Sequence, residues 1–291
     1  MIPAPFDYLA PETLDEAVRA LAENGERAKL LAGGHSLLPM MKLRLVNPAV
    51  LIDLRRVPGL RGVRERGGKL VIGALTTHCE LESSELALQK CPLLCQTARA
   101  IGDVQVRNCG TIGGSLSHAD PAADWPAAIL ALGGELALKG PAGERSLAAA
   151  EFFLGPMATA AEPAEIMTEI RVPVFSGRCG SAYLKVPQPA SGFAIVGIAV
   201  WLRLGRNNRC EDIGIGVTGL AAKPFRAAAV EKSLRGSSLS PKLIEESAAS
   251  VANGIDPLED LHASAEFRAH LARVYAARAI AKAARSASQR R

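Results

Sequence analysis

Two glycine pairs in this sequence have the residue types and spacing that could form an anion-binding site. Gly33-Gly34 and Gly113-Gly114 each follow an apolar stretch typical of a strand, and a serine comes within two residues of each. Glycine allows a positive φ and a close approach of a ligand, and successive N–H groups in such a turn form a concave anion site. Either pair alone is typical of an ordinary turn. Two such turns brought together would suit a pyrophosphate, with the hydroxyls of Ser36, Thr111 and Ser115 as further donors.

A third glycine motif, residues 214–219, matches G-x-G-x-x-G without the context that dinucleotide binding requires. That fingerprint forms a turn between a strand and a helix. Here Ile213, Ile215 and Val217 alternate with small residues, which predicts a strand with one apolar face and one bare face. The motif therefore argues against a Rossmann site, although Glu231 is a possible acid for binding a ribose that comes early in the chain.

Acidic and histidine side chains near the second glycine pair leave two alternatives. His118, Asp120 and Asp124 could form a metal site, but Asp120 precedes Pro121 and is more simply the cap of a helix. Asp124 would then lie in the first turn near the positive end of the helix dipole, and could in addition reach a bound ligand. His35 could be a base, but no Ser-His-Asp or Cys-His order surrounds it. We expect a loop residue whose backbone matters.

No other pattern in the sequence indicates catalysis or metal binding. The chain has no Walker motif, no H-E-x-x-H and no nucleophile elbow. None of its six cysteines belongs to a C-x-x-C pair, the usual sign of a zinc or iron–sulfur site. We therefore expect no catalytic acid–base residue and no metal on this chain.

Length and composition narrow the class of protein. The 291 residues suffice for two domains, and 48% hydrophobic with 22% charged residues is typical of a globular protein. The net charge of +5 comes from the C-terminal segment, so we expect no nucleic-acid binding. The basic residues of this segment are Arg273, Arg278, Lys282, Arg285, Arg290 and Arg291. No apolar run is long enough for a membrane span and no signal peptide is visible, so we expect a cytoplasmic protein.

The elements that must position these residues alternate between strands and helices. Hydrophobic periodicity predicts strands over residues 28–31, 50–54, 69–72, 165–173, 193–204 and 212–219. Capping signals and apolar stripes predict helices over residues 14–24, 93–101, 121–131, 241–253 and 264–286, with another beginning after Thr77. The turn-rich composition of residues 175–192 predicts a domain boundary near residue 176, so the sequence indicates a two-domain α+β protein.

Four segments resemble one known family. They are Ala32-Gly-Gly-His-Ser36 with residues 37–44, Thr111-Ile-Gly-Gly-Ser115 with residues 118–126, the opening Met-Ile-Pro-x-x-Phe-Asp-Tyr, and the strand that ends at Pro173. On these motifs the chain resembles, over essentially its whole length, the FAD-binding medium subunit of molybdenum hydroxylases of the carbon monoxide dehydrogenase and xanthine dehydrogenase type. The pair of glycine motifs at this separation is far more specific than either motif alone.

The resemblance implies a fold and a cofactor site. Residues 1–176 would form a vanillyl-alcohol-oxidase-like (PCMH-type) FAD-binding domain. Residues 177–291 would form a smaller flavoprotein C-terminal domain of a three-stranded antiparallel sheet and helices. The FAD-binding positions that the resemblance implies are Lys29, Leu30, Leu31, Ala32, Gly33, Gly34, His35, Ser36, Ile101, Thr111, Ile112, Gly113, Gly114, Ser115, Asp124, Met167, Lys185 and Phe193. The chain departs from relatives at Ser115, where asparagine is common, and at Phe193, where some relatives have a tyrosine against the flavin.

The resemblance also implies a role in electron transfer. A large partner subunit would carry the molybdenum cofactor and hydroxylate the substrate, and a small partner subunit would carry two [2Fe–2S] clusters. Electrons would pass from these clusters through FAD to an external acceptor, and the expected assembly is a dimer of heterotrimers. Such a subunit needs no acid–base pair of its own. A stand-alone FAD-dependent oxidase or reductase of the same fold and a non-enzymatic interaction module remain as alternatives.

Overall fold

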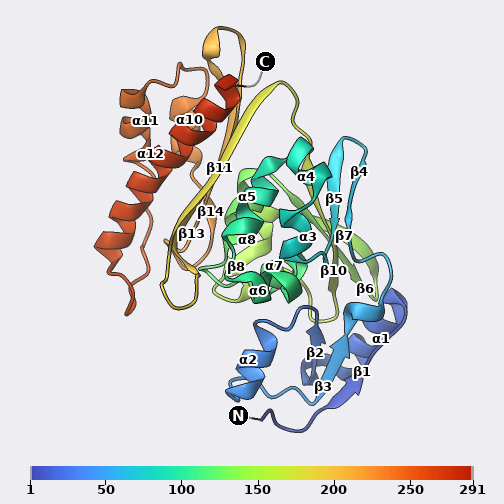
Figure 1. The fold of residues 1–291 in the computed structure, drawn as a ribbon. Coiled ribbons are helices and arrows are strands. Elements are labelled where there is room, and N and C mark those ends of the chain that lie inside the picture. Colours follow the sequence, from blue (N-terminus) through green and yellow to red (C-terminus); the bar gives the residue numbers. More distant parts are fainter. Residues whose placement is uncertain (1, 290–291) are drawn as a thin grey trace.

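The beginning of the chain forms a small parallel sheet. The computed structural model describes residues 2–289, and in it β1 and β2 both pair in parallel with β3. A capping box of Thr13 with Glu16 begins α1 as predicted, and this helix buries its apolar stripe against the sheet. The elements of this lobe, blue in Figure 1, are β1 (Asp7–Leu9), α1 (Leu14–Asn24), β2 (Ala28–Leu31), α2 (Leu37–Lys42) and β3 (Val50–Asp53).

A five-stranded antiparallel sheet of order β4-β5-β10-β6-β7 completes the first domain. Its strands are β4 (Val63–Arg66), β5 (Lys69–Gly73), β6 (Glu135–Gly140), β7 (Gly143–Ala148) and β10 (Ile166–Pro173). The connections carry the helices α3 (His78–Glu82), α4 (Glu85–Lys90), α5 (Pro92–Ala100), α6 (Val104–Cys109), α7 (Ile112–His118), α8 (Asp124–Ala131) and α9 (Ala149–Phe152) and the hairpin of β8 (Phe153–Gly155) and β9 (Ala158–Thr159). The predicted strands of this domain and the helix over residues 93–101 are confirmed to within two residues.

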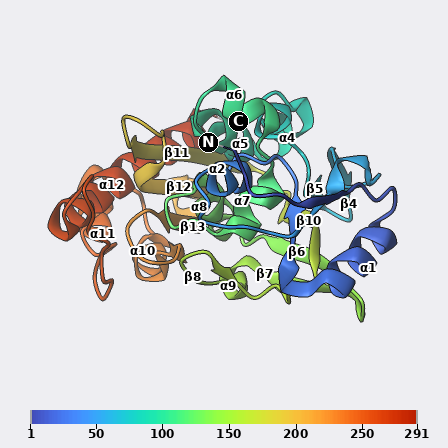
Figure 2. The same ribbon diagram turned by 90° about the horizontal axis from the view of Figure 1, so that it is seen from below.

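The second domain is a four-stranded antiparallel sheet of order β11-β12-β13-β14 with helices on one face. Its elements are β11 (Arg178–Pro187), β12 (Ala194–Leu204), β13 (Cys210–Thr218), β14 (Phe225–Arg226), α10 (Ala228–Leu234), α11 (Pro241–Ala248) and α12 (Ala265–Gln289). The three expected strands are the long ones, and β14 adds two residues at the edge. Figures 1 and 2 show α12 on one face of this sheet and α5 and α8 of the first domain on the other.

The third glycine motif lies in β13, and helix α8 packs against the face of this strand on which the glycines lie. A Cβ on Gly214 would lie 2.0 Å from the carbonyl oxygen of Ala131, and a Cβ on Gly216 would lie 1.9 Å from that of Ala127. The prediction of a strand is therefore confirmed. The two glycines allow the backbone of a helix to contact the sheet directly, which joins the two domains.

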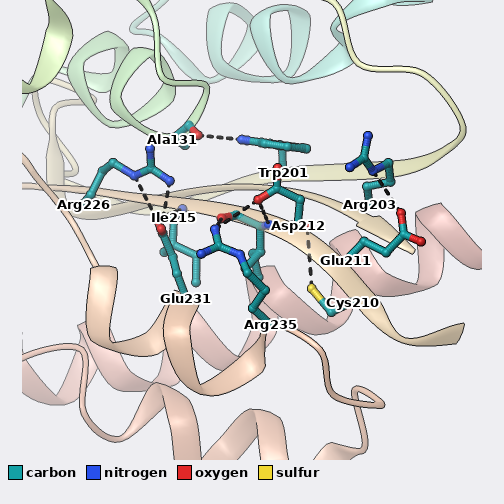
Figure 3. A network of polar contacts seen from close by, with 11 residues as sticks. Ala131, Trp201, Arg203, Cys210, Glu211, Asp212, Ile215, Arg226, Glu231 and Arg235 are labelled. Carbon is teal, nitrogen blue, oxygen red and sulfur yellow. Dashed lines mark hydrogen bonds and ion pairs between the residues drawn. The ribbon is translucent and has the colours of Figure 1, made fainter. Parts of the chain in front are cut away.

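Figure 3 shows one hydrogen bond between the domains, from Trp201 to Ala131, and a polar network within the second domain. Trp201 of β12 donates a hydrogen bond from Nε1 to the carbonyl oxygen of Ala131 at 2.6 Å. Glu231 is buried, accepts a hydrogen bond from the amide of Ile215 at 2.8 Å and pairs with Arg226. Because its carboxylate is used inside the protein, Glu231 is not placed to bind a ribose.

Helix α12 carries part of the predicted basic segment. Four of the six basic residues lie on it, and the other two, Arg290 and Arg291, lie outside the described residues. Among residues 2–289, every helix lacks the combination of length and apolar character that crossing a membrane requires.

Candidate cofactor site

One cavity brings the two glycine pairs together. Its volume is about 660 Å³, which is within the usual range for small-molecule sites. The lobe of β1–β3 forms one wall, the segments around α6 and α7 form another, and residues 191–193 of the second domain close one end. Of the predicted FAD-binding residues, all except Leu31, Ile112 and Lys185 line this cavity.

The glycines allow the two loops to touch. A Cβ on Gly33 would lie 2.2 Å from the carbonyl oxygen of Cys109 and 2.8 Å from Cα of Gly110. A Cβ on Gly114 would lie 3.7 Å from the Cβ of Ala32. Separations below 3 Å exclude any side chain at Gly33, so the contact between the loops depends on glycine there.

The first glycine loop presents unpaired backbone donors. The amides of Gly33, Gly34, His35 and Ser36 have no acceptor among the described residues. Gly34 has a φ of +74°, a conformation that favours glycine. The His35 ring is exposed and its Nδ1 lies 2.9 Å from the carbonyl oxygen of Gly33, so its backbone forms part of the loop as expected. Four adjacent unpaired amides are the donors that the predicted anion-binding turn requires, and anion binding there stays a prediction.

The second glycine loop differs from the prediction. It begins α7, with Thr111 as the N-cap, and follows α6 rather than a strand. Its amides are bonded within the protein: Ile112 to the oxygen of Thr76, Gly113 to that of Ala74, Gly114 to Oγ1 of Thr111 and Ser115 to the oxygen of Thr111. The amides of residues 112–115 therefore form no second row of unpaired donors, and FAD binding at these positions stays a prediction. Both glycines are closely packed, since a Cβ on Gly113 would lie 2.5 Å from the Cβ of Ala74 and a Cβ on Gly114 would lie 2.8 Å from Oγ1 of Thr111.

Asp124 forms a buried polar cluster with two residues of the second domain. Tyr183 donates a hydrogen bond to Oδ1 of Asp124 at 2.5 Å, and Lys185 donates one to Oδ2 at 3.0 Å. Burial raises the pKa of Asp124, an effect that the Lys185 ammonium opposes, and burial also raises the pKa of Tyr183 well above its ordinary value. Lys185 donates further to the carbonyl oxygen of Gly192 at 2.6 Å, and thereby fixes the turn that carries Phe193.

This cluster bears on the two alternatives for the acidic residues near α8, a metal site and a helix cap. Asp124 is bonded to protein side chains, and the described residues contain no group of three or more His, Cys, Asp or Glu side chains arranged for a metal. The expected cap at Asp120 is in the wrong place. Its Oδ1 accepts from the amide of Ala122 at 2.8 Å in a turn, whereas α8 begins at Asp124 with Ala123 as its N-cap.

Sequence reasoning missed three residues of the site. Tyr183 and Gly192 complete the cluster around Asp124, and no motif marks either of them. His78 lines the cavity, but it stands within the capping box of Thr77 and Glu80, which indicates only the start of a helix. Burial lowers the pKa of His78 to about 4, with a smaller contribution from the positive charges of His35 and Arg107.

The fold and the cavity define a cofactor-binding protein of two domains, and comparison with known proteins gives its family. The model of the FAD binding domain in molybdopterin dehydrogenase matches residues 4–175, and that of the CO dehydrogenase flavoprotein C-terminal domain matches residues 181–283. The chain therefore belongs to the family of FAD-binding medium subunits of molybdenum hydroxylases, a family of oxidoreductase components, as the resemblance predicts.

Individual relatives agree over almost the whole chain. The carbon monoxide dehydrogenase medium chain of Hydrogenophaga pseudoflava is 41% identical over 96% of this chain and 97% of its own length. The glyceraldehyde dehydrogenase medium chain of Sulfolobus acidocaldarius is 38% identical over 98% of this chain and 100% of its own length. The structure of carbon monoxide dehydrogenase from Hydrogenophaga pseudoflava superposes with a TM-score of 0.95 at 42% identity, covering 98% of this chain and 99% of that chain. These matches do not favour the alternative of a stand-alone oxidase or reductase.

Proposed function

We propose that FAD binds in the cavity between the two glycine loops, at the positions that the resemblance implies. The observation that carries this proposal is the row of four unpaired amides from Gly33 to Ser36, placed where the loops meet. An anion such as a pyrophosphate satisfies such donors without any Lys or Arg. Ile101 and Phe193 also line the cavity, and Phe193, which is 39% exposed, offers a ring surface for the flavin.

This chain would act as the electron-transfer subunit of its complex. Bound FAD supplies the capacity to exchange electrons singly or in pairs, and the residues of this chain hold and orient it. The proposed partners are a large subunit with the molybdenum cofactor and a small subunit with [2Fe–2S] clusters, in a dimer of heterotrimers that serves an external acceptor in the cytoplasm. The names of the relatives, which include medium chains and subunits of dehydrogenases, support the presence of further subunits.

We keep the boundary between the domains at residues 176 and 177. The ends of the two matching family models, at residues 175 and 181, support this position. The segment Ser176–Gly177 also follows the last strand of the first sheet and precedes β11, so few backbone hydrogen bonds cross it.

A glycine substitution tests the cofactor site. In Gly114→Val the new Cβ lies 2.8 Å from Oγ1 of Thr111 and 3.7 Å from the Cβ of Ala32, so the larger side chain displaces the cap and crowds the first loop, and we expect the folded protein to lose its FAD. The matched control is Gly155→Val, because Gly155 has open space around it. The measurement is the flavin absorption of each purified chain, with circular dichroism to check folding. Full FAD retention by a folded Gly114→Val variant would refute the site.

A second experiment tests the assembly. The chain is produced with and without the large and small subunits from the same source, and the mass of each product is measured by light scattering. We expect a dimer of heterotrimers only when all three chains are present, and hydroxylation of substrate only by that complex. Substrate hydroxylation by this chain alone would refute its role as an electron-transfer subunit.

A further inference from the structure

His78 is tied to the second glycine loop. It is the first residue of α3, it is 4% exposed, and its amide donates to the carbonyl oxygen of Gly110 at 2.9 Å. Both His78 and Gly110 line the cavity. The imidazole therefore lies against the loop that joins α6 to α7, where both line the cavity.

The partner of the ring fixes its tautomer. Trp125, a fully buried residue of α8, donates a hydrogen bond from Nε1 to Nδ1 of His78 at 3.0 Å. An indole nitrogen can only donate, so Nδ1 must be an unprotonated acceptor. The neutral ring then carries its hydrogen on Nε2, and a proton on Nδ1 would break the bond to Trp125. The pKa of about 4 agrees with a ring that stays neutral near pH 7.

The Nε2–H group has no acceptor among the described residues. Nε2 lies 2.8 Å from the position that a Cβ on Gly110 would occupy, so the absence of a side chain at Gly110 leaves room for the ring edge. Gly33 approaches the same Cα of Gly110 from the first loop. His78 lines the cavity, and a donor at the wall of a binding cavity can give its hydrogen bond to an oxygen of a ligand.

We propose that His78 is a further cofactor-binding residue, whose Nε2–H donates a hydrogen bond to an oxygen of the phosphate–ribityl chain of FAD. This inference rests on the proposed FAD site. His78 supplies a neutral donor with a fixed direction, and Trp125 is its positioning residue. The cofactor chain would then receive hydrogen bonds from the amides of the first glycine loop and from His78, which lies beside the second loop.

Two substitutions of His78 test the acceptor role of Nδ1 and the donor role of Nε2 separately. In His78→Asn the amide oxygen can replace Nδ1 as the acceptor for Trp125, but no donor remains at the position of Nε2. In His78→Gln the longer amide can place a donor near Nε2. The flavin is removed from the full-length chain, and the dissociation constants of FAD and ADP are measured by fluorescence and calorimetry for each variant.

We expect His78→Asn to weaken FAD binding at least tenfold and His78→Gln to recover most of that loss, with both variants folded. A loss that also appears with ADP places the acceptor on the pyrophosphate, and a loss confined to FAD places it on the ribityl chain. Unchanged FAD binding in His78→Asn, or equal weakening in both variants, would overturn the proposal. Failure of the unmodified chain to bind FAD would instead refute the proposed function.

Discussion

The buried His78 predicts a specific loss of stability in acid. Its pKa in the folded protein is about 4, against 6.5 for the unperturbed side chain. The unfolded state therefore binds more protons between these values, and the free energy of unfolding rises with pH across this window. The contribution of neutral His78 to the free energy of unfolding therefore falls as the pH drops below 6.5, and it is fully lost below about 4.

The size of the effect follows from the difference between the two values. Each pKa unit corresponds to about 1.4 kcal/mol, so the full loss is about 3 kcal/mol, and about 2 kcal/mol of it is present near pH 5. Burial of the ring is the main cause of the low pKa, and protonation of Nδ1 must also remove the hydrogen bond that Trp125 donates to it.

Urea unfolding of the flavin-free chain near pH 7 and near pH 5 measures this loss. His78→Asn is the control, because asparagine does not titrate and its oxygen can still accept from Trp125. We expect the unmodified chain to lose about 2 kcal/mol more than the variant between the two conditions. Carboxylates titrate equally in both proteins and cancel in the comparison. Equal losses in the two proteins would refute the assignment of His78 as a buried neutral ring.

The remaining predictions concern the contacts between the domains. Tyr183→Phe removes a hydrogen bond to the buried carboxyl of Asp124, and we expect urea unfolding to show a loss of about 1.5–3 kcal/mol; no loss would mean that the bond is not formed. Gly216→Ala places a Cβ 1.9 Å from the carbonyl oxygen of Ala127, and we expect a lower melting temperature corresponding to about 1–3 kcal/mol. An unchanged melting temperature would contradict direct contact between α8 and β13.

The sequence predicts the fold well where local signals and packing agree. The capping boxes at Thr13 and Thr77 both form, and the alternating pattern around Gly214 is a strand. The start of α8 could not be placed, because Asp120 offers a good cap but its side chain closes a turn instead. The helix begins only at Asp124, since that carboxyl is held by side chains from a strand about sixty residues later in the chain.

The same limit applies to residues of the site that no motif marks. His78 stands in a capping box, and its neighbours in sequence give no sign that Trp125 fixes its tautomer. Tyr183 lies in a strand whose pattern reports only burial. Both residues gain their roles from contacts across 47 and 59 positions, so a local pattern predicts the element that carries them but not the chemistry.

The two glycine pairs show why a motif predicts the place of a site better than the role of its residues. Their sequences are nearly alike, and both line the cavity. The first ends a strand, so its amides turn away from the sheet and remain unpaired. The second starts a helix beside Ala74 and Thr76, whose carbonyl oxygens take two of its amides. Acceptors more than thirty residues away in sequence therefore decide that the amides of Ile112 and Gly113 are not free donors. In our proposal, His78 supplies a donor on that side of the cavity.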